Sequence, residues 1–278
     1  MLGLNLGIKT VGDIAQPPYT PYTPGGLTRW YKQPIVSGSK WNSEVNHINN
    51  ATNWRQSEAN YTPTFTAGTS GNPNKLSFDV ANDTVMFMGE PGEDVGSTQQ
   101  AIQIAEADGV NNGDFTIIIC LERGSLIVND TFLGGSSNTS IGNNKFFFDD
   151  ANHKIGLFSY GDQGSAGISR FTVSGTPFAA GSLIVLMITR DANGAWVFST
   201  RTGTQNDYEI TDLTVTGGVN LGNKGEFGIA ALGADTDLNP TTHFTGDIYE
   251  LLYYNKALSQ SQREELFDNY LDAKYNNI

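Results

Sequence analysis

Short apolar segments of β-strand length, separated by turns rich in Gly, Asn and Asp, run through almost the whole chain. Asp114–Leu121 is a near-continuous apolar run, which is typical of a strand buried on both faces. Asn193-Gly194 lies between two apolar runs and is a strong hairpin signal. No helical periodicity interrupts this series before residue 259. The pattern therefore predicts a sandwich or barrel and argues against an α/β fold.

Turn residues divide the chain into fourteen expected strands. The 32 glycines among 278 residues supply many of these turns. We expect strands at Leu27–Tyr31, Leu76–Asp79, Thr84–Met88, Ala101–Ala105, Asp114–Leu121, Ser125–Asn129, Lys145–Phe148, Lys154–Ser159, Ile168–Ser174, Ser182–Arg190, Ala195–Arg201, Glu209–Thr214, Gly225–Ala231 and Gly246–Tyr254.

One helix is expected, over residues 259–275. Ser259 followed by Gln262 has the spacing of a capping box. Leu266, Tyr270 and their apolar neighbours then repeat every three or four residues, which indicates a helix with one apolar face. So short a helix is not stable alone, and we expect it to dock on the sandwich.

Residues 1–26 differ from the rest of the chain, and we separate them as an extended N-terminal arm before a domain at 27–278. Residues 16–26 contain four prolines, which disfavour helix and sheet pairing. One interpretation is a disordered tail. The other is an arm that lies on a neighbouring subunit, because its apolar residues alternate as in a pairing strand. That arm would bury Leu2, Leu4, Leu6, Ile8, Tyr19 and Tyr22.

The net charge, the apolar runs and the single cysteine limit the classes of function that we expect for this chain. The formal charge of −13 disfavours binding to nucleic acid or to an anionic membrane surface. The longest apolar run, Leu183–Ile188, is too short to span a bilayer, and the N-terminus lacks the features of a signal peptide. Cys120 is the single cysteine and lies in an apolar strand, so we expect a buried structural thiol. A chain without disulfides fits assembly in a reducing cytoplasm.

The C-terminal stretch from Gly246 to Tyr275 resembles the closing segment of laminin-G-like, concanavalin A-like jelly rolls. In both, a Gly-Asp-Ile-x-Glu strand is followed by Leu-Ser, a short acidic helix and Tyr-Leu-x-x-Lys-Tyr. Trp41-Asn42 and Leu76-Ser-Phe-Asp79 match the opening of such domains. The resemblance implies a two-sheet antiparallel jelly-roll sandwich over about residues 27–278. The short apolar start followed by a Pro/Tyr/Thr spacer resembles virion structural proteins of tailed phages, especially those of marine bacteria.

The same fold hosts glucanases, whose two catalytic carboxylates lie on one strand. The nearest match, Glu106-Ala-Asp108, lacks the second glutamate, and Asp247 and Glu250 belong to the closing strand. We therefore expect no enzyme activity. The three histidines, at positions 47, 153 and 243, show no metal spacing and are expected in exposed loops.

The sequence offers two weaker candidate ligand sites, and no cofactor other than calcium is expected. Asp235, Asp237 and Asn239 place three oxygen side chains in alternation, so they are calcium candidates, with a plain acidic loop as the alternative. Trp41, Trp54 and Asn42 combine aromatic rings with an amide, as sugar sites do, with buried core tryptophans as the alternative.

We therefore expect a non-enzymatic phage virion structural protein: a capsid decoration, neck or fibre component. Its arm would attach it to other virion proteins and to copies of itself, and this assembly would take place in the host cytoplasm. The alternatives are a carbohydrate-binding module for a host-surface or extracellular glycan, and a diverged glucanase.

Overall fold

The computed structural model describes twenty stretches of the chain, and the structural statements below concern these alone. They are residues 19–32, 36–37, 40–41, 54–56, 63–68, 73–79, 86–88, 102–105, 114–124, 130–134, 145–148, 154–160, 166–172, 178–191, 195–202, 211–212, 214–216, 227–229, 231–233 and 243–275.

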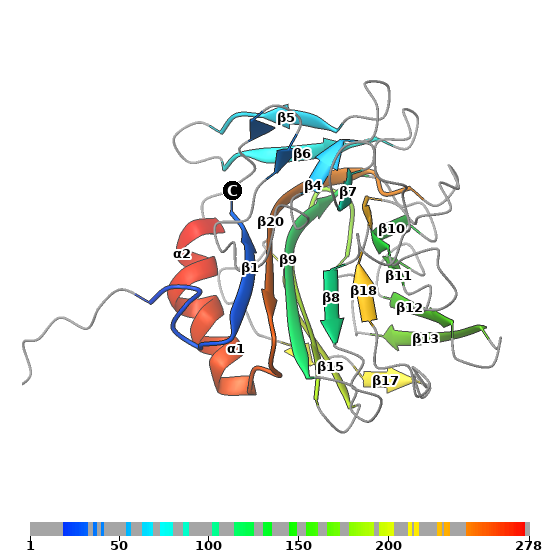
Figure 1. The fold of residues 1–278 in the computed structure, drawn as a ribbon, viewed down its shortest axis with the longest axis vertical. Helices are drawn as coiled ribbons and strands as arrows, with labels where there is room; N and C mark the ends of the chain where they lie inside the picture. The colour runs from blue at the N-terminus through cyan, green and yellow to red at the C-terminus, as the bar shows by residue number, and fades with distance from the viewer. Residues whose placement is uncertain are drawn as a thin grey trace, which may run out of the picture.

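The described strands form two large antiparallel sheets that face each other (Figure 1). The first has eight described strands: β1 (Leu27–Tyr31), β5 (Thr64–Thr66), β6 (Lys75–Phe78), β9 (Phe115–Arg123), β14 (Leu183–Arg190), β15 (Trp196–Thr202), β16 (Thr211–Asp212) and β20 (Gly246–Tyr254). The second has ten: β2 (Val36–Ser37), β3 (Lys40–Trp41), β4 (Trp54–Gln56), β7 (Met86–Met88), β10 (Asp130–Gly134), β11 (Lys145–Phe148), β12 (Lys154–Tyr160), β13 (Ala166–Thr172), β17 (Thr214–Thr216) and β19 (Ala231–Leu232). A separate pair joins β8 (Ile102–Ala105) to β18 (Phe227–Ile229).

The closing strand β20 organises the first sheet. One of its edges pairs with β9 along nearly its full length. The other edge pairs with β6 over Gly246–Ile248 and with β1 over Leu251–Tyr254. The last strand in sequence therefore lies in the middle of the sheet and joins elements from the beginning of the chain.

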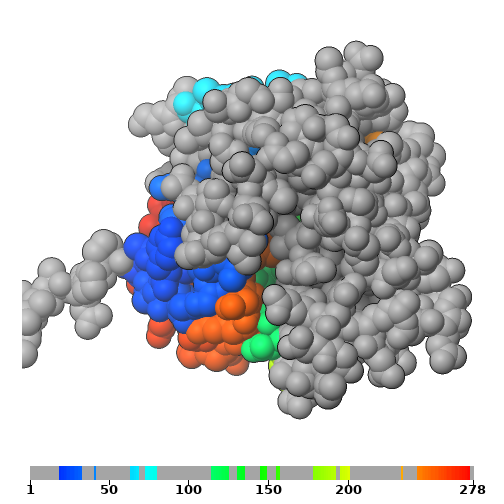
Figure 2. Space-filling model, viewed as in Figure 1, coloured from blue at the N-terminus to red at the C-terminus, as the bar shows by residue number. Residues whose placement is uncertain are grey.

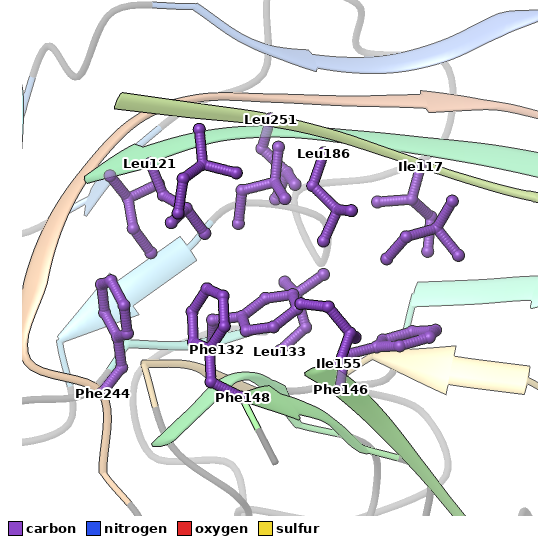
Figure 3. Packing of buried hydrophobic residues seen from close by; sticks show 14 of the residues in the cluster. Ile117, Leu121, Phe132, Leu133, Phe146, Phe148, Ile155, Leu186, Phe244 and Leu251 are labelled. Atoms are coloured by element: carbon purple, nitrogen blue, oxygen red, sulfur yellow. The ribbon is translucent and has the colours of Figure 1, made fainter. Parts of the chain in front are cut away.

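The core between the sheets has a different composition on each side (Figure 3). The first sheet contributes mainly branched aliphatic side chains, and the second contributes a cluster of phenylalanines. Phe132 and Phe148 lie 5.1 Å apart, ring centre to ring centre, which is close enough for favourable aromatic contact. Residues that show this division are Ile117, Leu121, Leu186 and Leu251 on one side and Phe132, Phe146, Phe148 and Phe244 on the other.

A second hydrophobic layer lies on the outer face of the first sheet, under the C-terminal helical segment. That segment comprises α1 (Gln260–Leu266), a π-helical turn (Phe267–Leu271) and α2 (Asp272–Tyr275). Ser259 caps it, and both hydrogen bonds of the capping box with Gln262 are present. Strand β9 is consequently buried on both faces, as its sequence predicts, and Cys120 is fully buried in the outer layer.

The all-β antiparallel sandwich with a C-terminal helix is confirmed, and most expected strands lie within two residues of the observed ones. The β14–β15 hairpin predicted from Asn193-Gly194 is present, with Asp191 N donating to Ala195 O at 2.9 Å. The strand expected at 125–129 falls outside the described residues; the next described strand is β10 at Asp130–Gly134. The single strand expected over 209–214 is wrong, because β16 and β17 belong to different sheets.

Replacing Gly156 with Ala is expected to destabilise the protein by about 1–3 kcal/mol, because overpacking forces shifts in a dense core. A Cβ at this buried position would lie 2.2 Å from the ring of Phe147 on the neighbouring strand. Urea unfolding followed by tryptophan fluorescence measures the loss. The Gly156→Ala/Phe147→Leu double variant should recover part of it. Equal unfolding midpoints for Gly156→Ala and the parent would contradict this packing.

Candidate functional site

Glu250, in the middle of β20, is a fully buried carboxylate that accepts four hydrogen bonds. Oε1 accepts from the indole nitrogen of Trp30 at 2.6 Å and from the hydroxyl of Tyr270 at 2.7 Å. Oε2 accepts from Lys274 Nζ at 2.8 Å and from the hydroxyl of Tyr275 at 2.6 Å. The carboxylate thus ties strand β1 and the helical segment to the central strand.

Glu250 and its four hydrogen-bond donors form a cluster with a structural role. Burial, with Glu250 as the next cause, raises the pKa of the hydroxyls of Tyr270 and Tyr275 well above their usual range. Both hydroxyls therefore stay protonated and remain donors. Burial likewise raises the pKa of the nearby Cys120 thiol, so this thiol is a poor nucleophile. A buried carboxylate with both oxygens occupied is not placed to act as a general acid or base on a substrate.

Residues 19–26 form a turn that is bonded to the end of β20 and to the start of the helix. Tyr254 donates its hydroxyl hydrogen to Pro21 O at 2.8 Å, and Asn255 N donates to Gly26 O at 2.9 Å. Lys256 Nζ also donates to Pro24 O. Figure 2 shows these residues, in blue, lying against the orange C-terminal segment. Residues 19–26, which fall within the expected N-terminal arm, are therefore bonded to the sandwich.

Tyr22 projects from this turn, and its side chain remains half exposed, at 52%. Its ring meets Trp30 edge-on at 5.6 Å, and Trp30 meets Tyr270 in the same manner at 5.9 Å. Tyr19 is partly buried against the outer hydrophobic layer. The turn itself is closed by Thr23 N donating to Thr20 O at 2.9 Å. Tyr22 is thus a large, exposed ring held on a turn that is bonded to the domain.

A row of polar side chains crosses the outer face of the first sheet beyond the helix. Thr64 pairs with Ser77, Ser77 with Asp247, and Asp247 with Glu122, on four adjacent strands. Leu76 and its neighbours point into the core, so the row points outward. We call these four residues the polar row.

The two carboxylates of the polar row are oriented by neighbouring donors. Asp247 accepts from Ser77 Oγ at 2.5 Å and from Lys75 Nζ at 2.6 Å. Glu122 Oε2 accepts from the hydroxyl of Tyr249 at 2.8 Å. Sequence reasoning missed Glu122, which follows the largely apolar run 115–121 near the end of β9; an acid after such a run was the available signal.

A buried ion pair joins the two sheets at one end of the sandwich. Arg123 Nε on β9 lies 3.5 Å from Asp130 Oδ2 on β10, and neither side chain is exposed. The guanidinium also lies over the ring of Phe148 at 4.4 Å. Burial raises the pKa of Asp130 to about 7, an effect that the adjacent Arg123 partly opposes. His243 is buried beside this region, so its expected exposure is wrong; the residue bridges to Thr131 of β10 just before β20 begins.

The other predicted site residues are only partly placed. Trp41 is buried in the core at 1% exposure, which is the alternative that its sequence left open. Trp54 lies on β4, and nothing is described of its side chain. Asn42, the calcium candidates Asp235, Asp237 and Asn239, the arm residues Leu2, Leu4, Leu6 and Ile8, and the glucanase-like Glu106 all lie outside the described residues.

Within the described stretches, no group of three or more His, Cys, Asp or Glu side chains is placed to hold a metal ion. None of the helices described has the length and apolar character needed to cross a membrane.

No family model and no curated protein matches this chain in sequence. Among solved structures, the binding domain of Paraclostridial Mosquitocidal Protein 1 matches with a TM-score of 0.56 at 11% identity, over 90% of this chain and 53% of that one. Tailspike protein 2 of Escherichia coli O157:H7 bacteriophage CAB120 matches at 0.46 and 12%, over 84% and 28%. The Ruminococcus gnavus IT-sialidase CBM40, bound to alpha2,3 sialyllactose, matches at 0.39 and 11%, over 58% and 92%. The chain spans about half the length of the first of these, whose similarity supports the sandwich fold.

Replacing Glu250 with Gln is expected to lower the free energy of unfolding by about 3–5 kcal/mol, because Lys274 would lose its buried partner. Urea denaturation measures this loss. Glu265→Gln, at an exposed position on α1, is the matched control and should change stability by about 0.5 kcal/mol or less. Similar losses in both variants would mean that the buried cluster does not hold the helix.

Asp130 is expected to make the protein less stable as pH rises from about 4 to 7. Its pKa is about 7 when folded and about 3.9 when unfolded, so the folded state binds the extra proton in this window. Asp130→Asn removes the titrating carboxyl, so the stability of the variant relative to the parent should rise across the same window and level off above it. Chemical denaturation at several pH values measures the difference, and a constant difference from pH 4 to 8 would refute the expectation.

Proposed function

We propose that this chain is a non-catalytic structural protein of a tailed-phage virion, attached through its N-terminal segment and presenting a lectin-like sandwich. Its partners are other virion proteins and copies of itself, and it assembles onto the particle in the host cytoplasm. The function needs no cofactor. The virion setting rests on the resemblance of the N-terminal segment and the sandwich to such proteins.

The N-terminal turn is the observation that carries the attachment part of the proposal. Its bonds to Tyr254, Asn255 and Lys256 hold residue 19 at one place beside the helix. Whatever precedes residue 19 therefore leaves the domain from a fixed point. A domain tethered at a fixed point keeps a defined orientation, as a component of a regular particle requires.

Tyr22 adds a rigid contact next to that exit point. Large aromatic side chains with little conformational freedom are common anchors of protein interfaces. Tyr22 is the most exposed large apolar side chain among the described residues, and its turn is already ordered by the domain. We assign it to the surface that meets the particle, together with residues 1–18.

The first test is removal of residues 1–18 only. The bonds of residues 19–26 to β20 and the helix are kept in this variant, so its thermal midpoint should match that of the full chain. Phage lacking their own copy are complemented with either protein, and purified particles are analysed by quantitative mass spectrometry. The truncated chain should be absent from particles. Normal incorporation would refute attachment through this segment, and absence of the full-length chain would refute the virion role.

The second test replaces Tyr22 with Ala in the full chain. We expect about a tenfold loss of incorporation or more, because interface anchors contribute a large share of binding energy. Phe65→Ala is the matched control, since Phe65 is also an exposed aromatic residue but lies on the edge strand β5. Equal incorporation of the two variants would remove Tyr22 from the attachment surface.

A further inference from the structure

Two residues of the polar row are arranged in a way that lowers the stability of the folded protein. Asp247 and Glu122 are directly opposite each other on adjacent antiparallel strands. Like charges in opposite positions of a sheet destabilise it. Lys75 offsets the charge of Asp247, whereas Glu122 has only the neutral hydroxyl of Tyr249 as a described hydrogen-bond partner. Departures from local rules of stability are expected at functional or strained sites.

Both carboxylates are held in place in advance of any ligand. Tyr249 is buried, with 3% of its surface exposed, and its hydroxyl orients Glu122. Lys75 and Ser77 orient Asp247. Binding groups that are supported by neighbouring hydrogen bonds and carried on strands are positioned more precisely than those on loops.

The row also has room for a ligand. Thr64 and its neighbour Thr66 are exposed, and Ser77 and Glu122 are partly exposed. The side chain of Asp247 keeps 15% of its surface accessible, and that of Lys75 keeps 34%. With strands about 4.8 Å apart, Thr64 to Glu122 spans about 14 Å, which suits an extended oligomer lying across the strands.

The hydrogen-bonding capacity of the row indicates the class of ligand. Glu122 Oε1 accepts no hydrogen bond from the described residues. Two carboxylates favour a ligand rich in hydroxyl donors, while the hydroxyls of Thr64 and Ser77 both donate and accept. Lys75 Nζ, 2.6 Å from Asp247 Oδ2, already supplies a positive charge to this carboxylate. The carboxylates and the net charge of −13 repel acidic ligands.

From this geometry we infer that the polar row, with Lys75, is a binding site for neutral carbohydrate, in which Glu122 and Asp247 accept hydrogen bonds from sugar hydroxyls. The inference goes beyond the proposed attachment function and does not depend on it. It also places the sugar site away from Trp41, whose ring is buried.

The test uses the purified full chain in affinity electrophoresis and calorimetry. The probes are three neutral polysaccharides (dextran, laminarin and a galactomannan) and 3′-sialyllactose as an acidic sugar. We expect binding to at least one neutral polysaccharide and none to sialyllactose. Absence of binding to every one of the three neutral probes would overturn the inference, and so would binding of sialyllactose that survives the substitutions below. None of these results bears on incorporation into particles.

Variants then assign the site. Glu122→Gln and Asp247→Asn should each weaken binding about tenfold or more, because charged hydrogen bonds are among the strongest. Glu122→Gln also removes the like-charge contact, so its thermal midpoint should stay equal or rise, which separates lost binding from lost folding. The control Glu265→Gln should bind as the parent does. Unchanged affinity in Glu122→Gln and Asp247→Asn would overturn the assignment, and release of reducing sugar by the parent would show catalysis instead of simple binding.

Discussion

The buried carboxylate of Glu250 is the interaction on which the arrangement of the closing elements depends. A charge without exposure is tolerated only when its oxygens are paired, and here the four donors come from β1 and from the helical segment. Burial of Glu250 in the centre of the sheet therefore requires β1 and the helical segment to pack around strand β20. Docking the helix in turn covers the outer face of β9, which explains why that strand is apolar on both sides.

The two proposed surfaces lie at opposite ends of β20 as a result. The end near Tyr254 holds the N-terminal turn and therefore sets the point from which residues 1–18 leave the domain. The end near Asp247 carries the polar row, beyond the cover of the helix. With about 3.3 Å per residue, the nine-residue strand separates the two ends by about 25 Å. A protein attached at one end would leave the other open to a ligand.

Much of the fold could be predicted from local patterns in the sequence. The bounds of Gly246–Tyr254, the cap at Ser259 and the hairpin after Arg190 follow from periodicity and turn chemistry. The turn at 19–26 could not be predicted from the sequence, because its order comes from backbone oxygens that accept bonds from distant Tyr254 and Lys256. Proline content indicates an extended chain but carries no information about what that chain contacts. His243 was misassigned for a related reason: its burial depends on β10, which lies far away in sequence.

The sequence by itself determined the class of fold, the buried Cys120 and the helix that closes the sandwich, because alternation, capping and turn residues act over a few positions. Only the tertiary structure decided which polar residues meet. Thr64, Ser77, Asp247 and Glu122 come from four separate segments, and strand register alone places them in one row. A shift of one residue in any of these strands would turn its member of the row into the core, and no local pattern specifies that register. The same holds for Glu250. The sequence places this residue on the closing strand, but its four hydrogen-bond donors are brought around it only by tertiary packing.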